Sequence, residues 1–99
     1  MKFDESYELL EDMTADSSFP KKLTAKIKAQ MKPVIVLLEQ NVRDTAKLQA
    51  AFDKMTVAIN PLMQECPDAE EIVAADVLYI LEWFDIDLDV DDALRKRAW

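Results

Sequence analysis

The sequence predicts an all-α protein: an irregular, partly orthogonal bundle of four main helices plus a short C-terminal helix, in a single domain over residues 1–99. Apolar residues recur every three or four positions through most of the chain, as in amphipathic helices. The sequence has no pair of candidate strands that could form a sheet, and the short connections between the predicted helices favour antiparallel neighbouring helices. Pro33 and Pro61 fall inside predicted helices, which argues against a regular coiled bundle.

The first two predicted helices are amphipathic. One covers about Asp4–Thr14, and the next runs from Lys21 to about Gln40. Proline lacks an N–H, so Pro33 should kink or break the second helix near Met31–Lys32. Five lysines lie opposite the apolar face of this helix: Lys21, Lys22, Lys26, Lys28 and Lys32.

Three further helices are expected. The third covers about Thr45–Met63, where Pro61 should bend the last turn or end it early. The fourth, Asp68–Phe84, is apolar over most of its circumference and is the predicted core helix. Asp68 is the expected N-cap, with Glu71 as its reciprocal partner. The last helix is short, about Asp91–Arg97.

Asp76 interrupts the apolar face of the core helix. At 100° per residue, Glu71, Leu78 and Glu82 fall on one side, while Asp76 falls among apolar residues on the other. A carboxylate in such a face needs hydrogen-bond donors, because burying an unpaired charge costs several kcal/mol. There are two interpretations of Asp76. It accepts hydrogen bonds from a neighbouring segment, for instance the Ser17–Lys21 corner, or it lines a ligand pocket and its carboxyl group has a raised pKa.

The composition disfavours most enzyme classes. The chain has no glycine and no histidine, so phosphate-cradling loops, nucleophile elbows and ordinary catalytic triads are not expected. Cys66 is the one cysteine and cannot form an intramolecular disulfide or a structural zinc site. We expect no cofactor and no catalytic residue. An acidic N-terminus and the lack of a long apolar run indicate a cytoplasmic protein.

Charge is distributed unevenly along the chain. The net charge is −8, residues 17–54 carry eight basic residues against three acidic ones, and no basic residue occurs between Met55 and Leu94. An acidic surface favours a basic protein partner over nucleic acid or anionic membrane. The expected partner-binding residues are six carboxylates of this acidic half: Asp76, Glu71, Glu82, Asp85, Asp87 and Asp89.

Two other charged motifs do not meet the requirements of a binding site. The spacing of Asp85, Asp87 and Asp89 resembles a calcium loop, but Val90 stands where an EF-hand needs glycine and Lys96 where it needs glutamate. We therefore expect a solvated connection and no metal. The lysine face of the second helix has no arginine and no interleaved aromatic, and such a charge run is usually a solvated face.

Several short motifs resemble a family of small bacterial proteins of unknown function. They are LLEDM at 9–13, FPKKL at 19–23, EEIVAADVLYI at 70–80 and RKRAW at 95–99. The family pattern has an aromatic where this chain has Ser18, and a glycine in the loop where it has Asp85 to Asp87. The resemblance implies an all-helical single domain and no activity.

Two function classes remain open. The favoured one is a non-enzymatic protein-binding or regulatory module, similar to immunity or inhibitor proteins, that uses its acidic surface as a monomer or weak homodimer. The alternative is a carboxylate-based enzyme or small-ligand binder with a pocket around Asp76. A flat acidic face would favour the first class, and a deep pocket at Asp76 the second.

Overall fold

Three long helices form the body of the protein in the computed structural model, which describes residues 1–99 and contains no strand. The all-α class and the short C-terminal helix are therefore confirmed. Two short helices and one 3-10 turn complete the structure. The elements are α1 (Glu11–Ala15), α2 (Lys21–Glu39), α3 (Thr45–Glu65), η1 (Pro67–Ala69), α4 (Glu70–Trp83) and α5 (Val90–Ala93).

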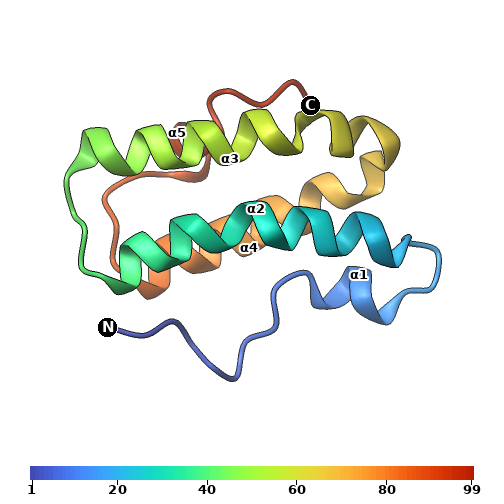
Figure 1. The fold of residues 1–99 in the computed structure, drawn as a ribbon, viewed down its shortest axis with the longest axis horizontal. Helices are drawn as coiled ribbons and strands as arrows, with labels where there is room; N and C mark the ends of the chain where they lie inside the picture. The colour runs from blue at the N-terminus through green and yellow to red at the C-terminus, as the bar shows by residue number, and fades with distance from the viewer.

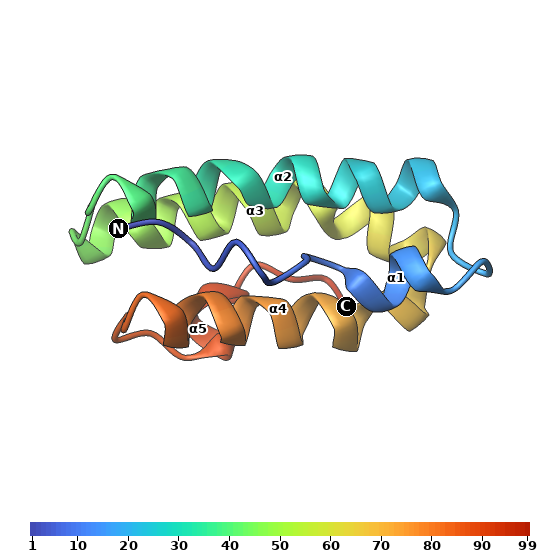
Figure 2. The same ribbon diagram turned by 90° about the horizontal axis from the view of Figure 1, so that it is seen from below.

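The long helices α2, α3 and α4 run roughly along the same direction, and successive ones are antiparallel (Figures 1 and 2). The expected four helices before the short C-terminal one are present, although α1 has only five residues. The three long helices lie side by side, without the expected orthogonal crossing (Figures 1 and 2). All helices contribute to one core of 21 buried apolar residues, within which Phe52 is the largest fully buried side chain.

Neither internal proline ends its helix. Pro33 lies inside α2, and Pro61 lies inside α3, which extends to Glu65. Beyond Pro33, the side chains of Val34, Ile35 and Leu38 are buried. Their burial stabilises the continued helix against the hydrogen bond that proline removes. Of the two outcomes expected at Pro33, a kink or a break, the break does not occur.

The ends of α2 and α4 use left-handed residues. Asn41 has φ 64° and Asp85 has φ 53°. In both places the next amide donates back across the helix end, Val42 to the Leu37 carbonyl and Ile86 to that of Leu81. This is the Schellman arrangement, in which glycine is the usual left-handed residue.

The start of α4 differs from the prediction. Asp68 lies inside η1, and no side chain caps α4, whose first residue is Glu70. The Asp68–Glu71 capping pair was therefore wrong. A 3-10 turn after Pro67 supplies the entry to the helix instead, which is a frequent way to begin one.

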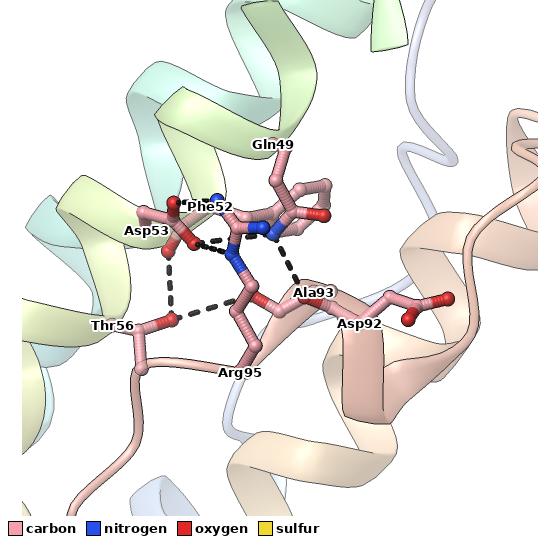
Figure 3. Close-up of polar contacts among 7 residues, drawn as sticks. All are labelled: Gln49, Phe52, Asp53, Thr56, Asp92, Ala93 and Arg95. Atoms are coloured by element: carbon pink, nitrogen blue, oxygen red, sulfur yellow. Dashed lines mark hydrogen bonds and ion pairs between the residues drawn. The ribbon is translucent and has the colours of Figure 1, made fainter. Parts of the chain in front are cut away.

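The C-terminal segment is fastened to α3 (Figure 3). Gln49 donates to the Asp92 carbonyl at 2.8 Å, and the Thr56 hydroxyl reaches the Ala93 carbonyl at 3.5 Å. Arg95 makes a two-point contact with Asp53 at 3.0 and 2.6 Å. Helix α5 is shorter than the predicted Asp91–Arg97 and is capped by Asp89.

The N-terminal segment is the largest departure from the sequence prediction. Only Glu11–Ala15 is helical, whereas residues 1–10 are irregular and lie between α2 and α4 (Figure 2). We call residues 1–10 the N-terminal strap. The predicted helix over Asp4–Thr14 was wrong because long-range hydrogen bonds to α4 hold the backbone in another conformation, and such contacts override local propensity.

Candidate functional site

Asp76 lies under the N-terminal strap. Its side chain is buried, with 5% exposed. Oδ1 accepts a hydrogen bond from the Tyr7 hydroxyl at 2.5 Å, and Oδ2 accepts one from the Leu10 amide at 2.6 Å. The donors expected from the Ser17–Lys21 corner are not the partners. Asp76 thus accepts hydrogen bonds from a neighbouring segment, as the structural interpretation expects, but that segment is the N-terminal strap.

The electrostatics of Asp76 reflect two opposed effects. Burial raises the pKa of this carboxyl, because a low-polarity surrounding disfavours its charge. The hydrogen bonds from Tyr7 and Leu10 act in the other direction, since they stabilise the ionised form. Burial and the nearby carboxylate also raise the pKa of the Tyr7 hydroxyl, which keeps that hydroxyl a donor.

The amide that Asp76 binds belongs to a strained residue. Leu10 has φ 57° and ψ 34°, the left-handed region that costs an ordinary L-residue roughly 1–2 kcal/mol. Its side chain is nevertheless fully buried, with 0% exposed. Burial of a leucine side chain contributes about 1.5–3 kcal/mol, which offsets the strain. Asp76 therefore fixes the turn that directs Leu10 into the core.

Aromatic side chains hold the rest of the strap against α4. The rings of Tyr7 and Tyr79 stack with centroids 3.9 Å apart, and Phe3 packs edge-on to both. The Tyr79 hydroxyl donates to Asp4 at 2.5 Å, and the Trp83 indole donates to the Lys2 carbonyl at 3.0 Å. Asp76, Tyr79 and Trp83 form one side of α4 that is occupied by this chain's own N-terminus.

No cavity of the molecule is lined by Asp76. Both carboxylate oxygens already have donors, and the strap covers them. The pocket that the alternative function requires is absent from this place. The observed arrangement positions a chain segment and leaves no space for a substrate beside the carboxylate.

The outward side of α4 is different. Glu71, Ala75, Leu78 and Glu82 are all exposed, with Leu78 46% exposed. Neither Glu71 nor Glu82 forms an ion pair or a side-chain hydrogen bond. We call these four residues the α4 stripe. The helical-wheel prediction that Glu71, Leu78 and Glu82 share one side, opposite Asp76, agrees with the observed exposures.

The other predicted partner-binding carboxylates are dispersed. Asp85 terminates α4, and together with Asp87 it lines a cavity of about 200 Å³ that also contains Arg43. Asp89 caps α5 by accepting the Asp92 amide at 2.7 Å. No three acidic or thiol groups are placed to hold a metal ion. Glu71 and Glu82 are exposed on the outward side of α4, whereas the exposed Asp85, Asp87 and Asp89 lie in the loop after it.

Tyr7 was missed by the sequence reasoning. Its place in an apparent amphipathic stripe concealed its hydroxyl contact with Asp76, 69 residues away. The usable signal was the buried acid itself, which requires donors, together with a tyrosine in a segment rich in acids. Pattern alone does not say which donor meets it.

The fold and its anchored ends define a class: a small all-α protein with a three-helix body onto which both terminal segments are hydrogen-bonded. None of its helices combines the length and apolarity needed to cross a membrane. Over residues 3–99 the chain matches the model of a family described as "Family of unknown function (DUF5713)". The chain belongs to that family, which confirms the resemblance to a family of unknown function. No curated protein and no solved structure matches it.

Proposed function

We propose that the protein is a non-enzymatic binding module whose α4 stripe docks a basic protein segment. The observation that carries this proposal is an exposed leucine between two carboxylates that have no partner in the chain: Leu78 is 46% exposed, and Glu71 and Glu82 form no ion pair. Apolar contact at the centre with charges around it is a common arrangement of protein interfaces.

The distribution of charge along the chain supports the proposal that the partner is basic. No lysine or arginine occurs between Met55 and Leu94, so no base of α4 itself offsets Glu71 or Glu82. The net charge of −8 would also accelerate encounter with a cationic protein. The fitting segment is a short amphipathic helix or loop with lysine or arginine beside an aliphatic residue.

The alternative of a carboxylate-based enzyme or ligand binder at Asp76 has less support. The strap fills the space beside this carboxylate, and both of its oxygens are engaged. The α4 stripe is the better candidate because its charged groups are free to meet a partner.

The test is capture from native lysate with three immobilised proteins: the unchanged chain, Glu71→Gln/Glu82→Gln, and the matched control Glu5→Gln/Glu11→Gln. The control removes two exposed carboxylates of the N-terminal region that likewise form no ion pair. A captured protein is identified, purified and titrated against all three at low and high salt.

We expect a basic partner that the stripe variant binds about threefold to tenfold more weakly, with the control unchanged and high salt releasing the complex. Leu78→Ala should weaken the same complex. A partner that is acidic, that is insensitive to salt, or that both charge variants bind equally would refute the proposal, as would the capture of none.

A further inference from the structure

A groove of about 510 Å³ lies between α2 and α3. Pro33, Val34 and Leu37 of α2 and Ala51 and Met55 of α3 provide most of its apolar lining. Two of its lining residues, Ala29 and Ala51, have small side chains. The volume falls in the range of small-molecule sites, which are mostly apolar with a few polar groups.

The groove is an apolar surface that the chain leaves in contact with solvent. Val36, one of its lining residues, is 46% exposed, and Ala29 and Pro33 are also exposed. The strap lies instead between α2 and α4 (Figure 2), and the C-terminal segment is bound along the side of α3 that carries Gln49, Asp53 and Thr56 (Figure 3). Neither terminal segment occupies the groove.

The charged side chains that line the groove are all positive. Lys32 of α2 and Lys54 of α3 are the charged lining residues, and no carboxylate lines the groove. Neither lysine forms an ion pair in this chain. None of the four carboxylates of α2, α3 and the loop between them lines the groove: Glu39 accepts from the Phe3 amide, Asp44 caps α3, Asp53 pairs with Arg95, and Glu65 is the last residue of α3.

The extent of the groove favours a small ligand. On α2 it reaches from Ala29 to Leu37, which is about 12 Å of helix, whereas α3 contributes only Ala51, Lys54 and Met55, about one turn. A docked helix needs contact residues spaced over at least two turns. A flexible alkyl chain can instead follow the apolar lining of α2 while its head stays near the two ammonium groups.

We propose that the α2–α3 groove binds a small anionic amphiphile, a single-chain carboxylate whose tail lies on Pro33, Leu37 and Met55 and whose head lies beside Lys32 and Lys54. The binding is noncovalent. It uses a face different from the α4 stripe, so it stands or falls independently of the proposed function.

Three probes with a ten-carbon chain test this assignment: decanoate and decyltrimethylammonium, each titrated below its micelle concentration, and decanol, titrated below its solubility limit. Binding is followed by amide NMR shifts. Because the whole chain carries −8, its overall field favours the cation, and preference for the anion must come from local lysines. We expect decanoate to bind most tightly, with shifts centred on residues 29–37 and 51–55.

Substitutions in the groove distinguish the contribution of the two lysines to ligand binding from the contribution of the apolar space. Lys32→Gln/Lys54→Gln should weaken decanoate about threefold to tenfold and leave decanol unchanged. The matched control Lys22→Gln/Lys47→Gln removes two exposed lysines of the same helices that do not line the groove, and should bind decanoate as before. Ala51→Leu fills the space from a half-exposed position and should weaken all tail binding.

The proposal is overturned if decanoate shows no saturable binding, if the cation binds as well as the anion, or if the shifts lie outside the groove. Equal losses in the groove variant and the lysine control would likewise overturn it, because they would show a general charge effect. Folding of each variant is checked by its circular dichroism spectrum and urea midpoint.

Discussion

Removing the Asp76 carboxylate should loosen the N-terminal strap and destabilise the protein. In Asp76→Ala, the Leu10 amide and the Tyr7 hydroxyl lose their acceptors, which lie at 2.6 and 2.5 Å. A buried donor left unpaired costs about 1–3 kcal/mol, and the half-buried hydroxyl adds about 1 kcal/mol. Loss of the buried carboxylate's own desolvation cost partly compensates. We therefore expect a net loss of about 2–3 kcal/mol in the free energy of unfolding.

The assay combines urea unfolding, followed by circular dichroism, with amide hydrogen exchange. A loss of this size lowers Tm by about 8–24 °C in a domain of this length and is measurable against a typical stability of 5–15 kcal/mol. Exchange should accelerate first at Leu10 and its neighbours in the strap, before amides of α3, because the lost contacts lie between the strap and α4.

Glu82→Ala is the matched control, since it removes an exposed carboxylate from the same helix and should change stability by no more than about 0.5 kcal/mol. Tyr7→Phe removes one donor only, so its loss in the free energy of unfolding should lie between those of Glu82→Ala and Asp76→Ala. Unfolding of Asp76→Ala within 0.5 kcal/mol of the unchanged chain would refute the anchoring role. Rapid exchange of the Leu10 amide in the unchanged chain would refute it equally.

Three further predictions concern charge and backbone. Burial raises the folded-state pKa of Asp76, so the folded state binds more protons than the unfolded state at pH values near and above 3.8. Acidification from neutral pH toward 3.8 should therefore stabilise the unchanged chain relative to Asp76→Asn. Parallel urea titrations should show the free energy of unfolding of the unchanged chain rising relative to that of the variant as the pH falls. The hydrogen bond from Arg95 lowers the pKa of Asp53, so the stability advantage over Arg95→Gln should be present above pH 3.8 and disappear as the pH falls further; a difference that persists in acid would contradict the pairing. Asp85→Gly should stabilise the protein by about 0.5 kcal/mol because glycine adopts φ 53° without strain, and a lower Tm would argue against this.

The sequence identified much of the body of the fold. The starts of α2 and α3 at Lys21 and Thr45 agree with the prediction, because helical periodicity and turn residues act over a few neighbouring positions. The burial of Asp76 and the exposure of Glu71 and Glu82 followed from the same periodicity. These are local properties of one helix, and they need no knowledge of what packs against it.

The strap and the groove could not be predicted in this way. Phe3, Tyr7 and Leu10 have the spacing of an amphipathic helix, but their segment is irregular because partners on α4 fix it from far along the chain. The α2–α3 groove likewise depends on which side chains of two helices meet, and pairing between helices is not encoded in the period of either one.

The sequence by itself thus determined an acidic all-α protein, its three long helices, and which side of α4 holds a buried acid. The tertiary structure alone decided that Tyr7 and Leu10 meet this acid, 69 and 66 residues away, and that Glu71 and Glu82 remain free. The physical reason is range: side-chain periodicity reports whether a residue faces inward, whereas hydrogen-bond partners are chosen by contacts that form only when distant segments pack.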